Sequence, residues 1–500
     1  MGDGGDDLGA RGPTSASLRG SAFVVVAAIQ FVIVLINGST TMALPAVQSG
    51  LGASNAGLQW FAALFALAYS LVLVLAGRLG DLYRVRRLLL LGFAGFVGSM
   101  ALAAVAPDLS WLLVARALQG LSAGVMAPQL AAVIQRTFTG HARTRAFAVY
   151  LTVAAAAFTV GQLVGGGLMA ADPWGLGWRW AFVPFVLPAL ALWFVARTAL
   201  PNPAPEAAGR LDVPGAAGLA VVSFLLMFPL VQGRSAGWPL WIVVLLVAAA
   251  PGFALFVAFE RRLVRRGGSP LVNPDLFRIR SFRAGNTITL LVGLVCAAVP
   301  LYLILTVQLG FGRNAFAAAV LACPMPIANM AGSLATAPLV RRFGRRSIAV
   351  GAGLTALAAV VILLVTAGGA GRVEVAVLVP GFVLIGFSLG ISITAATAIV
   401  LSDVPGADAG SAAGVQATGL QLASAVGIAV YGVAFFGAVG GGHRLQPYLD
   451  GLGRVMWITI ALSAVQVVLM FGLPRRADGV RRLDRSVRSA DGPLADRRRT

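Results

Sequence analysis

The sequence predicts an all-α integral membrane protein. Its 500 residues are 58% hydrophobic and only 11% charged, and the mean hydropathy is +0.88. Soluble domains carry about 25% charged and about 45–50% apolar residues, so a single soluble core could not absorb this apolar excess. Long apolar runs recur along the chain, and about 20 apolar residues in a helix cross a bilayer core. These observations exclude an ordinary soluble globular protein.

The apolar runs are numerous enough for fourteen transmembrane helices. They lie at 22–47, 57–77, 88–106, 110–134, 146–170, 180–200, 214–232, 240–259, 285–309, 316–339, 347–367, 376–401, 412–437 and 455–473. An even number of spans places both termini on the same side of the membrane.

The positions of the basic residues predict which side that is. All 38 are arginine, and cytoplasmic loops of membrane proteins are enriched in positive charge. With a cytoplasmic N-terminus, 31 arginines lie inside, six lie outside, and Arg116 lies within a span. We therefore expect a multi-pass protein of the cell membrane with both termini cytoplasmic. The net charge of +20 then reflects topology, and we expect no nucleic-acid partner.

A weak internal repeat divides the chain. The segments 77–92 and 337–351 are both short basic loops that join the second and third helices of a six-helix unit. The predicted organisation follows in chain order: a cytoplasmic tail at 1–21, a six-helix bundle at 22–200, a linker with two inserted helices at 201–283, a second six-helix bundle at 284–474, and a basic disordered cytoplasmic tail at 475–500. Repeated halves of this kind place a binding site between them.

Several short motifs lie in these spans. The loop after the second span reads GRLGDLYRVRR, with Gly77 and Asp81 near its start and Arg84 and Arg86 further on. The other motifs are ALP at 43–45, ARALQG at 115–120, GQLVGG at 161–166, WRWAF at 178–182 and the small-residue segment at 410–427.

Together and in this order, the motifs resemble the fourteen-helix drug:proton antiporter branch of the major facilitator superfamily, over nearly the whole chain. The resemblance implies the major facilitator fold and a multidrug or antibiotic efflux permease that couples export to protons. Three positions depart from the family pattern. Arg84 replaces a glycine of the loop signature, Gln162 replaces a proline of the antiporter signature, and Ile36 stands where the first helix usually carries an aspartate.

Polar residues inside the spans are the candidates for the substrate and proton pathway. Arg116 is the central one, because an ionisable residue within a membrane is a functional candidate by default. Two interpretations are open: Arg116 binds an anionic group or tunes a proton site, or it belongs to a structural network with Gln119 and backbone carbonyls. The other candidates are Asn37, Thr41, Gln119, Gln162, Tyr69, Gln308 and Asn329. For Asn37 and Gln162, a structural interhelical hydrogen bond is the competing interpretation.

Two further groups are predicted from the motifs. Gly77, Asp81 and Arg86 lie at the cytoplasmic end of the second span and are the candidates for a cytoplasmic gate; a surface ion pair is the alternative for Asp81. Small residues repeat every four positions in the fourth and fifth spans, which favours close helix packing or a hinge. The glycines concerned are Gly120, Gly161, Gly165 and Gly166.

The carboxylates restrict the choice of function. None of the 18 Asp and Glu residues lies well inside a predicted span, so a proton would use Asp81 or another span-end carboxylate, or travel on the substrate. We expect a small amphipathic substrate, protons as the coupling ion, the lipid bilayer as surroundings, a monomer, no cofactor and no metal. The alternatives are a dedicated exporter of one metabolite without proton coupling, and a degenerate transporter that serves as a membrane sensor or scaffold. An enzyme is not expected, because the spans hold no nucleophile–base set.

Overall fold

The computed structural model describes residues 15–201, 212–266, 268, 270, 274–367, 374–404, 409–439 and 445–471. Within these ranges, the side chains of Arg78 and Asp81 and of a few other residues are not described. The predicted C-terminal tail and most of the predicted N-terminal tail lie outside the described residues.

The prediction of fourteen membrane-spanning helices is confirmed. The described residues contain no β-strand, and fourteen helices are long and apolar enough to cross a membrane. In chain order, the helices are α1 (Ser15–Met42), α2 (Leu44–Leu51), α3 (Asn55–Leu82), α4 (Val85–Ala104), α5 (Leu109–Thr137), α6 (Gly140–Ala171), α7 (Val183–Ala199), α8 (Val213–Gln232), α9 (Leu240–Arg265), α10 (Arg280–Leu305), α11 (Ala315–Ala322), α12 (Pro324–Phe343), α13 (Arg346–Thr366), α14 (Val379–Val400), α15 (Ala409–Val439) and α16 (Leu445–Met470). Short η segments lie at Gly177–Ala181, Pro274–Arg278, Thr306–Gly310 (η3) and Val375–Leu378.

Side-chain caps stabilise the first turns of four described helices, α3, α5, α8 and α11. Ser54 caps α3 by accepting a hydrogen bond from the Gly57 amide at 3.2 Å, and Asp108 caps α5 by accepting one from the Trp111 amide at 3.1 Å. Such caps satisfy an amide that has no partner within the helix.

Proline divides two of the predicted spans. The run at 22–47 becomes α1 and α2, because Pro45 stands in the first turn of a new helix, and the run at 316–339 becomes α11 and α12 at Pro324. Proline has no amide hydrogen and favours the first turn of a helix. The sequence showed continuous apolar runs here, so these two breaks correct the predicted helix bounds.

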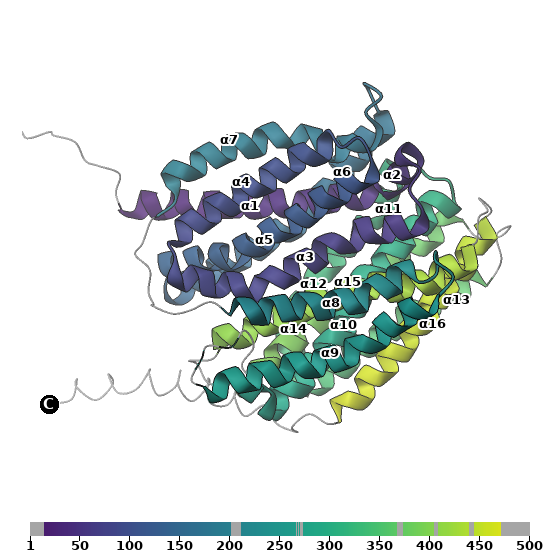
Figure 1. The fold of residues 1–500 in the computed structure, drawn as a ribbon. Coiled ribbons are helices and arrows are strands. Elements are labelled where there is room, and N and C mark those ends of the chain that lie inside the picture. The colour runs from purple at the N-terminus through teal and green to yellow at the C-terminus, as the bar shows by residue number, and fades with distance from the viewer. Residues whose placement is uncertain are drawn as a thin grey trace, which may run out of the picture.

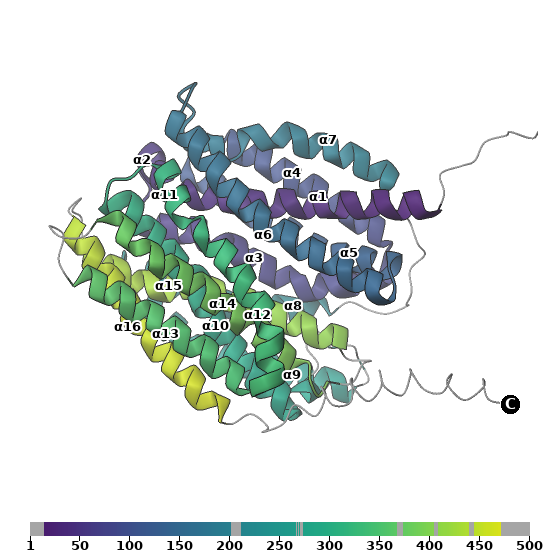
Figure 2. The same ribbon diagram turned by 180° about the vertical axis from the view of Figure 1, so that it is seen from behind.

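The two groups of helices repeat the same packing. In the first group α1 packs on α6, α3 on α5, and α4 on both α5 and α7. In the second group the corresponding pairs are α10 with α15, α12 with α14, and α13 with both α14 and α16. The groups lie side by side, and Figure 1 and Figure 2 show them from opposite sides. The domain boundaries drawn from the sequence stay predictions.

Contacts between the groups come mainly from α3 and α6 of the first group and from the inserted pair. α3 packs against α15, and α6 packs against α11 and α12. The inserted helices α8 and α9 pack on each other, and α8 also contacts α3 and α15 (Figure 1). The inserted pair therefore covers one side of the junction between the two groups.

Candidate functional site

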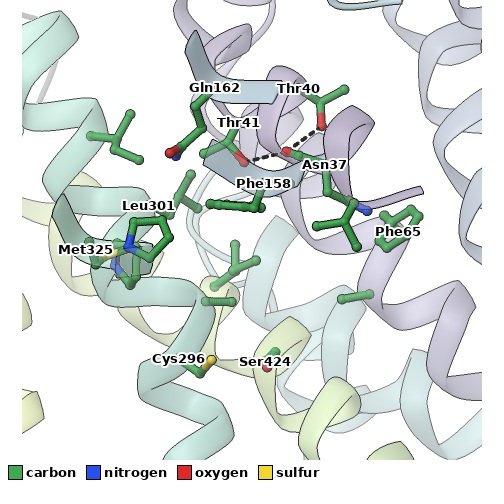
Figure 3. Close-up of a pocket in the computed structure, with 18 of the residues that line it drawn as sticks. Asn37, Thr40, Thr41, Phe65, Phe158, Gln162, Cys296, Leu301, Met325 and Ser424 are labelled. Carbon is green, nitrogen blue, oxygen red and sulfur yellow. Dashed lines mark hydrogen bonds between the residues drawn. The ribbon is translucent and has the colours of Figure 1, made fainter. Parts of the chain in front are cut away.

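A cavity of about 500 Å³ lies between the two groups of helices. The first group contributes residues of α1, α3, α5 and α6, and the second contributes residues of α10, α12, α14 and α15. In Figure 3, Asn37, Thr41, Phe65 and Gln162 lie on one side, and Cys296, Leu301, Met325 and Ser424 lie on the other. A cavity of this size lies within the range of small-molecule binding sites.

Arg116 of α5 lies at the wall of this cavity and is 4% exposed. Its Nε donates to the backbone carbonyl of Phe61 at 3.3 Å, and its Nη1 donates to Oε1 of Gln119 at 3.0 Å. The guanidinium carbon lies 5.1 Å from the ring centre of Phe61 and 4.9 Å from that of Phe65. These contacts are within cation–π range. Among the described residues, no carboxylate lies within ion-pairing distance of Arg116.

Five of the candidate pathway residues line the cavity: Asn37, Thr41, Arg116, Gln162 and Asn329. The cavity thus collects polar groups from α1, α5, α6 and α12. The placement agrees with the sequence-based choice, while the transport role of each residue stays a prediction.

Three other candidates lie away from the cavity wall. Gln119 supports Arg116 through the hydrogen bond described above. Tyr69 of α3 has its backbone against Gly124 of α5, and its ring centre lies 6.1 Å from that of Phe65. Gln308 lies in η3, where its Nε2 is 3.8 Å from the sulfur of Met42. None of the three is among the described residues that line this cavity. Their part in the pathway stays a prediction.

Asn37 and Thr41 hydrogen-bond to the backbone of their own helix, α1, whereas Gln30 of α1 accepts a hydrogen bond from the Tyr150 hydroxyl of α6 at 2.8 Å. Asn37 donates from Nδ2 to the carbonyl of Ile33 at 3.0 Å, and Thr41 donates to the carbonyl of Asn37 at 2.8 Å (Figure 3 draws the Thr41 bond). The alternative interpretation of Asn37 as an interhelical donor therefore finds no support in these contacts.

Gln162 of α6 is buried at the cavity wall, and no described residue is its hydrogen-bond partner. Its exposed fraction is 0%, and neither amide atom has a described partner. An unsatisfied buried amide costs about 1–3 kcal/mol, so this side chain is suited to a polar group that enters the cavity.

The candidate hinge glycines lie where helices meet at backbone distance. A Cβ at Gly161 would lie closer than 3.0 Å to the backbone of Leu35, and one at Gly120 would lie equally close to the backbone of Phe65. Gly165 faces Ser39 in the same way. A Cβ at Gly166 would instead lie 2.8 Å from the carbonyl of Ala315 in α11, so Gly166 lies where α6 meets the second group.

The three candidate gate residues do not form one cluster that the structure describes. A Cβ at Gly77 would meet no atom within 4 Å. The side chain of Asp81 lies outside the described part. Arg86 donates from Nη2 to the backbone carbonyl of Arg197 at the end of α7. This bond stays within the first group and joins α4 to α7. The gate role of Arg86 stays a prediction.

One carboxylate lies deeper than the sequence indicated. The predicted span at 240–259 ended before Glu260, but α9 continues to Arg265 and Glu260 is 1% exposed. Asp212, which caps α8 by accepting from the Gly215 amide at 2.8 Å, lies beside it. Oδ2 of Asp212 and Oε1 of Glu260 would both come closer than 3.0 Å to a Cβ at Gly215. The two carboxyl groups are therefore neighbours at one end of the inserted helix pair.

Sequence reasoning missed the aromatic part of the cavity. Phe61 and Phe65 of α3 and Phe158 of α6 line it. Phe61 and Phe65 are four residues apart and so share a helix face. That spacing was visible in the sequence, but an apolar face can equally contact lipid, so nothing assigned it to the cavity.

Comparisons with known proteins agree with this architecture. The model of the Major Facilitator Superfamily matches residues 26–428. The probable actinorhodin transporter of Streptomyces coelicolor is 34% identical over 87% of this chain and 76% of its own length. The puromycin resistance protein pur8 of Streptomyces alboniger is 31% identical over 89% of this chain and 88% of its own length.

Solved structures share the fold at low sequence identity. The inward-facing, unoccupied structure of a bacterial homologue of the human lysosomal transporter Spinster superposes with a TM-score of 0.65 at 15% identity, over 92% of this chain and 97% of the other. At this identity, the similarity concerns the fold alone.

Proposed function

Since this chain belongs to the Major Facilitator Superfamily, a family of membrane transporters rather than an enzyme class, we propose that it exports small amphipathic compounds by alternating access. The observation that carries the proposal is the cavity between the two helix groups, where apolar walls surround a few polar side chains. Such a site suits a solute with an apolar body and few polar groups.

The names of the relatives give the direction of transport and the class of compound. One is a probable transporter of actinorhodin and another confers resistance to puromycin. Drugs, dyes and antibiotics are accordingly the proposed cargo, and efflux from the cell is the proposed direction.

The proposed setting is the cell membrane, with both termini in the cytoplasm. The arginine distribution supports this orientation, and the lipid-facing side chains of the outer helices, such as Leu91 at 70% and Leu255 at 72% exposed, suit a bilayer. We propose a monomer, because each molecule contains both helix groups that line the cavity.

Transport can be tested in a drug-sensitive bacterial host. Cells that produce the protein should accumulate less of a fluorescent amphipathic dye and grow at higher antibiotic concentrations than cells with an empty vector. A variant with a filled cavity, Ala62→Trp, is the matched control, since Ala62 lines the cavity beside Phe61. Equal accumulation in all three strains, with the protein present in the membrane, would contradict the proposal.

Proton coupling is part of the proposal, and Glu260 is its candidate carboxylate. Support comes from its burial within α9, because buried ionisable groups in membrane helices are seldom retained without a function. We expect a protonophore to abolish efflux, and Glu260→Gln to make efflux independent of the proton gradient or to stop it. Asp450→Asn is the control, because Asp450 is an exposed carboxylate whose Oδ1 accepts from Gln446. Efflux that survives gradient collapse would remove the coupling and leave export standing.

A further inference from the structure

We propose that the cavity selects amphipathic anions, with Arg116 as the counter-charge of the anionic group. The inference rests on the proposed export function and narrows its substrate class. It starts from the balance of charge around the cavity, which the two helix groups build from many apolar and few polar side chains.

Among the described residues that line the cavity, Arg116 is the one with a charged side chain. Its charge is partly compensated by the Phe61 carbonyl, by Oε1 of Gln119 and by the faces of two phenylalanine rings. None of these groups carries a negative charge. A cation held in a low-dielectric site without an opposite charge attracts an anion strongly.

The guanidinium also has donors left to offer. A guanidinium carries five N–H donors, and the described hydrogen bonds of Arg116 use one on Nε and one on Nη1. The donors on Nη2 and the second donor on Nη1 have no described protein acceptor. Planar donors of this kind suit carboxylate and sulfonate oxygens.

The rest of the cavity provides for the apolar body of such a molecule. Phe65 and Phe158 offer aromatic faces from the first group, while Leu301 and Met325 offer apolar surface from the second (Figure 3). Gln162 offers a buried amide with no described partner, which can bind a hydroxyl or carbonyl group. The expected ligand is an aromatic compound with one acidic group.

The same arrangement disfavours cationic amphipaths. No described carboxylate reaches the cavity wall, so a cation would have no opposite charge there and would be repelled by Arg116. A small inorganic anion such as chloride shares the chemistry of the anionic group, and the test must separate it from an organic anion.

The test uses the full chain in nanodiscs of zwitterionic lipid and three fluorescent probes with one ring system. The probes are pyrenebutyrate, its neutral primary amide, and pyrenebutylamine as the cation. We expect pyrenebutyrate to bind at least tenfold more tightly than the amide, with the amine weakest. Arg116→Gln should reduce this preference to less than threefold, and Arg116→Lys should keep a preference for the anion. Arg179→Gln is the matched control, since Arg179 stacks on Trp178 away from the cavity.

The ranking of the three probes in the unsubstituted protein needs no variant, so a misfolded Arg116→Gln would not prevent a decision. Equal binding of anion and amide, or tighter binding of the amine, would overturn the inference. Full displacement of pyrenebutyrate by chloride at the same molar concentration would also overturn the inference, because it would indicate a site for inorganic anions.

Efflux of the same probes from cells separates this inference from the proposed function. If the amide or the amine is exported and the anion is not, export stands and the selectivity for anions is wrong. If none of the three probes binds above the lipid background and none is exported, the proposed export function itself fails.

Discussion

Gly161 of α6 lies directly against the backbone carbonyl of Leu35 in α1. The second helix group repeats the contact, with Gly427 of α15 against the carbonyl of Leu294 in α10. A Cβ at either glycine would come closer than 3.0 Å to the facing backbone. Because α1–α6 and α10–α15 are equivalent pairs, the first and fifth helices of each group meet through the same small-residue packing.

The first prediction concerns this contact. Gly161→Ala should lower the melting temperature of the purified protein, because the facing atoms are backbone and cannot rotate away. Overpacking of this kind costs about 1–3 kcal/mol. Gly98→Ala is the control: a Cβ at Gly98 meets nothing within 4 Å, and alanine is the better helix former. A Gly161→Ala protein as stable as the Gly98→Ala protein would show that α1 and α6 can separate at no cost.

The second prediction compares two buried glutamines. Gln162→Leu should raise stability by about 1–2 kcal/mol, because it removes an amide whose two polar atoms lack described partners. The same change should weaken the binding of polar substrates. Gln119→Leu should lower stability, because it removes the acceptor of the Arg116 Nη1 hydrogen bond at 3.0 Å. Thermal unfolding of both variants, with and without ligand, measures the contrast; destabilisation by Gln162→Leu would mean that its amide is satisfied in the native protein.

The third prediction concerns movement between the groups. The helices α3 and α15 run antiparallel, and Gln59 of α3 lies against Gly432 of α15. Eighteen residues further along each helix, Gly77 of α3 lies level with Gly414 of α15. Both glycines are then about 27 Å along the helix axes from the contact of Gln59 with Gly432. A Cβ added to Gly77 or to Gly414 would meet no described atom within 4 Å, so both positions face open space. We therefore expect these two positions to approach one another when the cytoplasmic side closes.

Cysteine cross-linking tests that movement after Cys296 and Cys323, which are free, have been replaced by alanine. The Gly77→Cys/Gly414→Cys pair should react weakly with a short bifunctional reagent at rest and more strongly during transport. The Met42→Cys/Gln308→Cys pair, which joins α1 to η3, should behave in the opposite way. Constant yields for both pairs would argue against alternating access.

The fourth prediction tests whether Arg86 stabilises the first helix group or takes part in closing the cytoplasmic side. Arg86→Gln should lower stability by about 0.5–1.5 kcal/mol, because it removes the hydrogen bond to the Arg197 carbonyl at the end of α7. It should leave the cross-linking of positions 77 and 414 unchanged. Arg87→Gln, the neighbouring substitution, serves as the control for loss of charge, because Arg87 is exposed. A changed cross-linking yield in Arg86→Gln alone would support the gate role that the motif implies.

Much of the candidate site could be predicted from the sequence. Arg116 and Gln162 stood out because polar side chains are rare in apolar spans, and both line the cavity. Tyr69 and Gln308 were polar residues in similar settings, yet they lie away from it. In a membrane helix every face is apolar, so the sequence pattern does not distinguish a face toward lipid from one toward the cavity.

The sequence by itself determined the membrane class, the fourteen spans and their order. A helix must satisfy its own backbone across about 30 Å of hydrocarbon, which requires apolar runs of a fixed length. Only the tertiary structure decided which of these helices meet, that Phe61 and Phe65 stack on Arg116, that Arg86 bonds within its own half, and that Glu260 is buried beside Asp212. Those outcomes depend on contacts between residues far apart in the chain, where close packing selects one arrangement from many that suit the same hydropathy.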